Sequence, residues 1–177
     1  MSSPNHDYFR ACEGSWACRF SVEVTDFTAL RRAVGLLNAG GLALLARWPG
    51  FLGTPRFRTS VAYDPSGQVV HTTRISWLGL PLARSREVLE LDVDGRGVTF
   101  LGEFRFLMAP WRVERVEAVG EVDETASRAS YTIQFLGAEM AQSAERLADR
   151  VTLTQTLPGY RAVQRLERVT PVTSPPP

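Results

Sequence analysis

The sequence predicts a mainly β protein, an antiparallel up-and-down β-barrel of about 8–10 strands with a short helix-turn-helix lid after its first strand. Apolar and polar residues alternate with period two through most of 56–169, which is typical of half-buried strands. Turn sequences such as Asp64-Pro65-Ser66-Gly67 and Pro158-Gly159 interrupt this alternation at short intervals. One further strand and two helical segments come before it.

The first strand begins near residue 15, where one face collects Trp16, Cys18, Phe20, Val22 and Val24. Thr25 or Asp26 is a helix-capping residue, and apolar residues then recur near helical spacing. We expect helices at roughly 27–38 and 41–48, separated by Asn38-Ala39-Gly40-Gly41.

Six further strands are expected at 56–63, 68–77, 84–93, 98–108, 112–122 and 130–136. The strand 112–122 carries charges on both faces, so its facing stays open. In particular, Arg115 and Glu117 form either an internal ion pair or an outward cross-strand pair.

Residues 138–169 decide between two folds. Met140, Ala144, Leu147, Ala148 and Val151 have the spacing of an amphipathic helix, but 138–147 also fits a weak strand. The alternating, β-branched segment 151–157 and a last strand at 160–169 favour the barrel. A C-terminal helix would instead give an α+β helix-grip fold.

A chain of 177 residues fits one domain, which we place at 15–169. Residues 1–14 are polar and are expected to be flexible, and the proline-rich segment 170–177 to be disordered. The N-terminus shows no secretory signal, and the apolar run 34–48 is too short and interrupted to span a membrane. These features predict a cytoplasmic protein with Cys12 and Cys18 as free thiols.

The net charge of +1 disfavours nucleic-acid binding, although all 20 basic residues are arginine. The sequence contains no P-loop, no dinucleotide-binding glycine motif and no histidine–cysteine cluster. We therefore expect no cofactor and no metal ion. The expected partner is a hydrophobic small molecule, and the chain is expected to be a monomer or a homodimer.

His71 and Glu87 are the candidate catalytic residues, because each shares the face of apolar neighbours on its strand. An ionisable group that points into an apolar interior can act as a general base or as a hydrogen-bond partner of a ligand. If both residues face inward on neighbouring strands, we expect them to form a pair. The alternatives are a satisfied core histidine and a carboxylate in contact with water at the strand entrance.

Several other side chains are candidates for ligand binding because a barrel's core and its pocket share one wall. The predicted ligand-binding residues are Trp48, Trp77, Phe100, Phe104, Tyr131 and Gln155. Gln142 and Tyr160 add hydrogen-bonding groups, and Leu42, Leu44 and Leu45 are expected to cover the opening together with Trp48. Ordinary core or lid packing is the competing interpretation for each.

Gly14-Ser15-Trp16 resembles the G-x-W sequence that opens the first strand of calycin barrels, the lipocalin and fatty-acid-binding-protein group. The helical segments after it are similar to the helical lid of fatty-acid-binding proteins. This resemblance implies that Arg165 or Arg168 packs over Trp16 and closes the barrel. The arginine–tyrosine carboxylate clamp of those proteins is absent. The order of elements also resembles the START-like helix-grip fold.

Three functions remain open from the sequence. The first is binding of a hydrophobic small molecule in the barrel cavity. The second is a cofactor-free cyclase or isomerase of secondary metabolism, in which the cavity folds a polyketide-like or polyene-like substrate and His71 or Glu87 moves protons. The third is a structural or partner-binding module.

Overall fold

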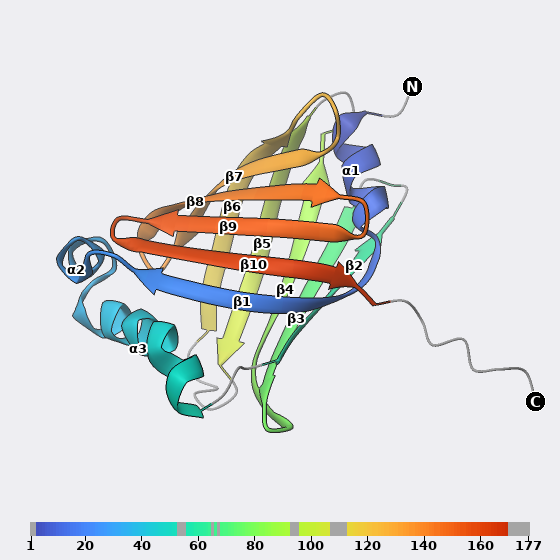
Figure 1. Cartoon of the computed structure of the whole chain (residues 1–177). Coiled ribbons are helices and arrows are strands. Elements are labelled where there is room, and N and C mark those ends of the chain that lie inside the picture. The colour runs from blue at the N-terminus through green and yellow to red at the C-terminus, as the bar shows by residue number, and fades with distance from the viewer. Residues whose placement is uncertain are drawn as a thin grey trace, which may run out of the picture.

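Ten antiparallel strands close into a barrel in the computed structural model, in the order β1-β10-β9-β8-β7-β6-β5-β4-β3-β2 (Figure 1). The structure describes residues 3–52, 56–64, 66, 68–92, 96–106 and 113–169. The expected tail 170–177 lies outside them. The predicted β-barrel is confirmed, and the helix-grip alternative is wrong because 138–168 forms three strands.

The strands follow one another as a meander and the last returns to the first. They are β1 (Gly14–Val24), β2 (Arg56–Tyr63), β3 (Gln68–Trp77), β4 (Leu80–Leu91), β5 (Gly97–Phe106), β6 (Val113–Val122), β7 (Arg128–Phe135), β8 (Ala138–Leu147), β9 (Arg150–Leu157) and β10 (Tyr160–Arg168). Three helices complete the fold within the described residues: α1 (Pro4–Cys12), α2 (Phe27–Val34) and α3 (Leu36–Leu52).

The segment that was ambiguous in sequence, β8, alternates like its neighbours. Met140 and Ala144 are buried, and the residues between them face outward or are half-buried. The preceding turn has positive φ at both Leu136 (54°) and Gly137 (76°), the backbone of a tight hairpin. This turn fixes the register of β7 against β8. A helix is excluded in this segment because β8 pairs with β7 from Ala138 to Glu145 and with β9 from Ala141 to Leu147.

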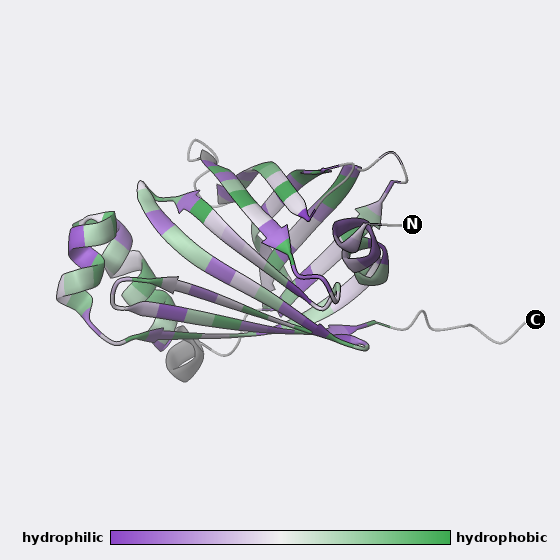
Figure 2. Cartoon of the chain, turned by 90° about the horizontal axis from the view of Figure 1, so that it is seen from above, coloured by the Kyte–Doolittle hydropathy of each residue, from purple (hydrophilic) through white to green (hydrophobic). Residues whose placement is uncertain are grey.

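Strand β6 turns one set of alternate residues inward and leaves the other set, which includes the apolar Val119, exposed. Val116, Ala118 and Val122 are buried, whereas Arg115 and Glu117 are exposed. Of the two alternatives for Arg115 and Glu117, the internal ion pair is therefore wrong, and both side chains face outward. Figure 2 shows the same alternation of hydrophilic and hydrophobic residues along the other strands.

Residues 4–12 form a helix, α1, where a flexible N-terminus was expected. Tyr8, Phe9 and Cys12 bury one face of this helix against the barrel. The Asn5 amide donates hydrogen bonds to the carbonyls of Asp92 and Gly97, both at 3.0 Å. The expectation of a flexible segment is wrong here because packing against the barrel, and not local propensity, holds so short a helix.

The lid consists of α2 and α3. Asp26 caps α2 by accepting hydrogen bonds from the backbone amides of Thr28 (2.9 Å) and Ala29 (3.0 Å). The break between the helices is at Gly35, where φ is 80°, and α3 runs straight through the expected break at 38–41. Only glycine adopts this backbone readily, so Gly35 sets the turn.

The lid packs against β1, which has no partner strand on one side over part of its length. β1 pairs with β2 only from Gly14 to Cys18, although it pairs with β10 as far as Val24. Helix α3 packs against β1, and Figure 1 places the lid at the end of the barrel opposite α1. The two ends of the barrel are thus covered by different helices.

Trp16 is fully buried at the α1 end, with Arg168 stacked on its ring at 4.4 Å from the centroid. The register places these residues directly opposite each other on β1 and β10. The Arg168 guanidinium also donates hydrogen bonds to the carbonyls of Glu13 and Ala11, and the Trp16 indole donates to the Cys12 carbonyl at 2.9 Å. Of the two arginines implied by the resemblance, Arg168 is the one that packs over Trp16.

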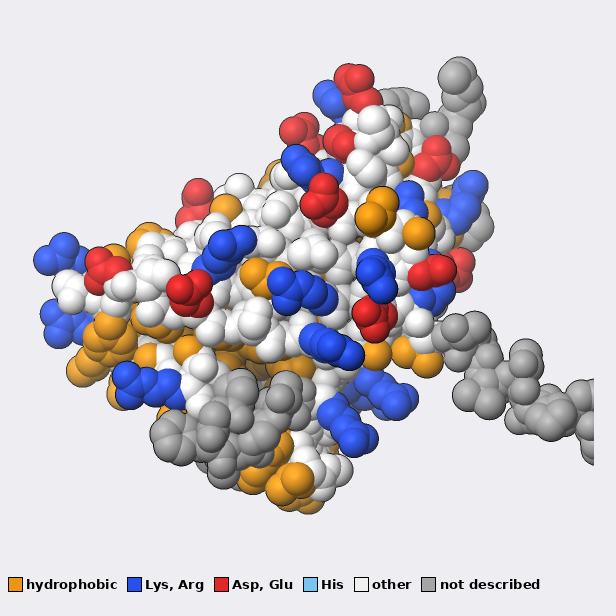
Figure 3. Space-filling model, viewed as in Figure 1, with side chains coloured by type: hydrophobic (Ala, Val, Ile, Leu, Met, Phe, Trp, Pro, Cys, Tyr) orange, Lys and Arg blue, Asp and Glu red, His pale blue; other side chains and the backbone are white. Residues whose placement is uncertain are grey.

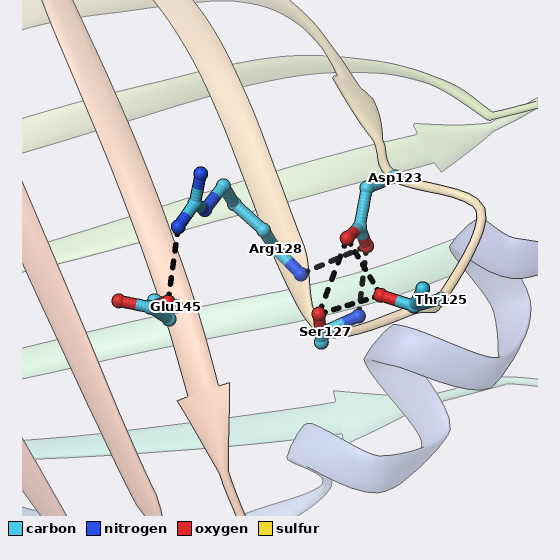
Figure 4. A network of polar contacts seen from close by, with 5 residues as sticks. All are labelled: Asp123, Thr125, Ser127, Arg128 and Glu145. Atoms are coloured by element: carbon cyan, nitrogen blue, oxygen red, sulfur yellow. Dashed lines mark hydrogen bonds and ion pairs between the residues drawn. The ribbon is translucent and has the colours of Figure 1, made fainter.

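The β6–β7 turn is held by one carboxylate (Figure 4). Asp123 accepts hydrogen bonds from the backbone amides of Ser127 (2.8 Å) and Arg128 (2.9 Å) and from the Thr125 hydroxyl (2.7 Å). The Thr125 hydroxyl and these amides lower the pKa of Asp123 to about 2. All of its partners belong to the turn or, in the case of Arg128, to the first residue of β7, so this cluster has a structural role.

Replacement of Arg168 by alanine is expected to lower the free energy of unfolding by about 2–4 kcal/mol, because it removes the cation–π contact and several charged hydrogen bonds. Arg165→Ala is the matched control, since Arg165 is exposed on the same strand. Urea denaturation measures both variants. Equal stability of the two would contradict the closing role of Arg168.

Candidate functional site

The barrel encloses a cavity of about 510 Å³. Helix α1 contributes Tyr8, Phe9 and Cys12 to its wall, and α3 contributes Leu42 and Leu45. The strands supply the rest of the lining, which is predominantly apolar. The cavity therefore extends between the two helical ends of the barrel.

Two of the four lid residues that were expected to cover the opening lie at the cavity. Leu42 and Leu45 line the cavity, whereas Leu44 is exposed, and the side chain of Trp48 lies outside the described residues. Hydrophobic side chains also gather on the outer surface around the lid (Figure 3), where Leu36 and Leu37 are exposed.

His71 and Glu87 meet inside the cavity. The β3–β4 register places them directly opposite each other, and His71 Nδ1 lies 2.5 Å from Glu87 Oε2. Their side chains keep 27% and 20% of their accessible surface, because they face the cavity, which they both line. The predicted pairing of these two residues is confirmed.

Each member of the pair stabilises the charged form of the other. Burial by itself lowers the pKa of His71, but the Glu87 carboxylate outweighs it, so the pKa is raised above 6.5. Burial likewise raises the pKa of Glu87, and the His71 charge reverses this to a value below 4.5. A hydrogen bond from Ser85, which is buried two residues before Glu87, acts in the same direction. The contact thus favours an imidazolium beside a carboxylate over the two neutral side chains.

Two glycines make room for the large polar side chains of the wall. Gly102 lies opposite Glu87 on β5, and a Cβ atom there would be 2.5 Å from Glu87 Cγ. Gly120 lies opposite Tyr131, and its Cβ would be 2.4 Å from the tyrosine ring. A larger residue at Gly102 would displace the Glu87 side chain, and one at Gly120 would displace the Tyr131 ring and also meet the Ser130 carbonyl oxygen at 2.2 Å.

The α1 end of the cavity holds neutral hydrogen-bonding groups. Burial raises the pKa of Tyr131, with smaller contributions from Cys12 and Glu87, and burial raises the pKa of Cys12 to about 11. Tyr8 forms a hydrogen bond with Cys12, and burial raises the pKa of Tyr8 as well. The hydroxyls and the thiol therefore stay protonated at neutral pH.

Three glutamines form a polar band on the wall made by β8, β9 and β10. Gln155 Nε2 donates to Gln142 Oε1 at 2.7 Å, and Gln164 Nε2 lies 3.5 Å from Gln155 Oε1. All three line the cavity, so Gln155 and Gln142 lie where the sequence placed them. Tyr160 also lines the cavity, with a pKa raised to about 12 by burial.

The predicted aromatic residues are divided between the cavity and other places. Phe100 and Phe104 line the cavity, and Phe100 packs edge-on against Tyr131 with ring centroids 5.8 Å apart. Trp77 is half-buried at the end of β3 and is not among the described lining residues.

Sequence reasoning missed several polar residues of the wall. Ser85 shares the parity of Glu87, so the alternation of β4 could have identified it. Thr59 and Thr73, whose hydroxyls are 3.0 Å apart, could have been identified in the same way. Tyr8 and Cys12 could not, because only the docking of α1 on the barrel brings them to the cavity.

Both cysteines are free, as predicted, and both are buried; burial raises the pKa of Cys18 to about 12. Within the part of the chain that the structure describes, no group of three or more His, Cys, Asp or Glu side chains is arranged to hold a metal ion. No described helix is long and apolar enough to cross a membrane.

Solved structures share this fold at low sequence identity. Rv2717c from M. tuberculosis aligns with a TM-score of 0.60 and 13% identity, over 96% of this chain and 100% of that chain. A point mutant of the fluorescent protein UnaG gives 0.51 and 15%, over 91% and 98%. A secretory abundant heat soluble protein from Ramazzottius varieornatus gives 0.51 and 10%, over 90% and 96%. The likeness shows a calycin-type barrel, and at such identities it shows the fold alone.

No family model matches the sequence, and no curated protein matches it either. The function must therefore be argued from the cavity itself.

Replacement of Glu87 by glutamine is expected to lower the pKa of His71 below its ordinary value, because burial then acts without the carboxylate. NMR titration of the imidazole carbon-bound protons measures this value, in a His6→Gln background that leaves a single histidine. An unchanged His71 pKa would show that the two side chains do not interact in solution.

The stability advantage of the wild type over Glu87→Gln is expected to depend on pH. His71 has a raised pKa, so its contribution is complete below pH 6.5 and is lost as the pH rises through the raised value. Glu87 has a lowered pKa, so its contribution is complete above pH 4.5 and is lost as the pH falls through the lowered value.

The difference in unfolding free energy should therefore be largest between pH 4.5 and 6.5, at about 1–3 kcal/mol. Urea denaturation from pH 3 to 9 checks this. A difference that stays constant across this range would contradict the ion pair.

Proposed function

We propose that this protein binds a hydrophobic small molecule inside the barrel. The observation that carries the proposal is the predominantly apolar cavity of about 510 Å³ inside the barrel. Small-molecule sites in proteins are typically apolar cavities of roughly 300–1,000 Å³ with a few polar groups that orient the ligand. This cavity has the same character, since its ionised pair and its glutamine band occupy small parts of an apolar wall.

Each part of the wall has a distinct role in this proposal. Phe100 and Phe104 supply apolar contact to the ligand, and Tyr131 and Gln155 supply hydrogen bonds. His71 and Glu87 anchor a polar group of the ligand. Trp77 has no part, because it is not among the described residues that line the cavity.

The ligand enters at the lid end. Helix α1 is fastened by hydrogen bonds from Asn5 to the β4–β5 connection and from Arg168 to the end of the helix. The lid instead packs against β1, whose stretch Arg19–Val24 has no partner on β2. Movement of α2 and α3 therefore opens the cavity without breaking a strand ladder.

Binding is favoured over the cyclase or isomerase alternative, for which the comparisons give no support. The contact between His71 and Glu87 suits an anchoring role as well as proton transfer, so it does not by itself argue for a reaction. A reducing compartment such as the cytoplasm suits the free thiols of Cys12 and Cys18.

Filling the cavity tests the proposal. Ala144 is buried in the cavity wall on β8, and Ala141 is exposed on the same strand. Ala144→Phe is expected to weaken binding of the neutral dye Nile red at least about tenfold, because the added ring occupies ligand space. Ala141→Phe should bind the dye like the wild type.

Native mass spectrometry of the purified wild type should show a co-purifying ligand that Ala144→Phe loses. Circular dichroism confirms that both variants are folded. Equal dye affinity of a folded Ala144→Phe and the wild type would contradict binding in the cavity.

A further inference from the structure

The charges on the cavity wall are already balanced. Among the described residues that line the cavity, His71 and Glu87 are the charged side chains, and they neutralise each other at 2.5 Å. The lining described here includes no arginine. Arg168 is engaged on the Trp16 ring and on the carbonyls after α1, so it is not available to a ligand.

A ligand carboxylate beside this pair would therefore find no free cation there, because Arg146, whose charge acts on Tyr8 and Cys12 at the α1 end, is not among the described lining residues. It would approach an ion pair of which one member, Glu87, is itself a carboxylate. A buried charge is stable only when it is paired and hydrogen-bonded, so an anionic ligand would bear an uncompensated desolvation cost. The same argument holds for an ammonium group, because the Glu87 charge is already satisfied by His71.

Hydrogen-bonding capacity, in contrast, remains on the wall. His71 Nδ1 is used by Glu87, which leaves the Nε2 atom as a donor for a ligand oxygen. The amide nitrogen of Gln142 forms no hydrogen bond within the described residues, while its oxygen accepts from Gln155. Neutral donors thus face an otherwise apolar space.

These donors lie on opposite walls of the barrel. In the ring of ten strands, β3 with His71 is five strands away from β8 with Gln142. The lining near the lid is apolar, with Leu42 and Leu45 from α3. A ligand with an apolar body and an uncharged oxygen between these walls satisfies both features.

Resting on the proposed function, we propose that the ligand is an uncharged lipid alcohol or ketone, whose oxygen accepts a hydrogen bond from His71, and not a lipid carboxylate or amine. The polar wall then selects against charge and for a neutral oxygen. The apolar wall contributes affinity without regard to the head group.

Competition against Nile red at pH 6, where both members of the pair are charged, tests the proposal with four ligands of one chain length, namely dodecan-1-ol, dodecan-2-one, dodecanoate and dodecylamine. The alcohol and the ketone are expected to displace the dye at concentrations at least about tenfold lower than the two charged ligands. Because uncharged chains also partition more readily into any apolar site, the decisive quantity is how the alcohol-to-carboxylate preference changes in a variant.

Glu87→Gln is expected to reduce this preference at least about fivefold, since it removes the carboxylate that opposes an anionic head group. Glu90→Gln is the matched control, because Glu90 is exposed on the same strand and should leave the preference unchanged. Circular dichroism checks the fold of both variants.

A preference of the wild type for dodecanoate or dodecylamine would overturn the proposal, as would an alcohol-to-carboxylate ratio that is the same in Glu87→Gln. Dye binding without displacement by any of the four ligands would overturn it too, while the proposed function would stand. Failure of the wild type to bind the dye or any of these ligands would remove both.

Discussion

Closure of the sheet is the constraint on which the rest of this molecule depends. Once β10 pairs with β1, every strand has two neighbours and alternate residues must point to one shared interior. Eight strands give an interior that side chains can just fill, and ten strands enclose more space than the inward residues of this chain occupy. The cavity is therefore a geometric result of strand number.

Register then determines which polar groups meet inside. His71 and Glu87 come together because the β3–β4 ladder pairs them, and a shift of one residue would turn both outward. Gly102 adds a second condition, since only its lack of a side chain leaves room for Glu87 on the inner face. Burial opposes both charges, and their mutual contact outweighs burial, so neither side chain is stable in this form without the other.

Much of this arrangement could be predicted from the sequence, because the alternation of polar and apolar residues along a strand indicates which side chains point into the barrel. Parity placed His71 and Glu87 on inner faces, and the β-branched segment of β9 favoured a barrel over a C-terminal helix. The signal failed where tertiary packing decides. Helix α1 has only nine residues, too few for its apolar spacing to distinguish it from a polar terminus. The lid breaks at Gly35 because of its backbone conformation, and not at 38–41, where the break was expected. The roles of Gly102 and Gly120 depend on cross-strand partners that sequence alone cannot assign.

The ladder between β1 and β2 is a weak point of the barrel, because it is short. Only five residue pairs, Gly14–Cys18 with Phe57–Val61, join these strands, whereas β1 and β10 are joined along nine. Local unfolding begins where the fewest hydrogen bonds must break, so this seam should exchange its amide protons before the other ladders do. The wall and the lid would then loosen together on the side of β1, and the rate of ligand exchange would be coupled to the local stability of a single seam.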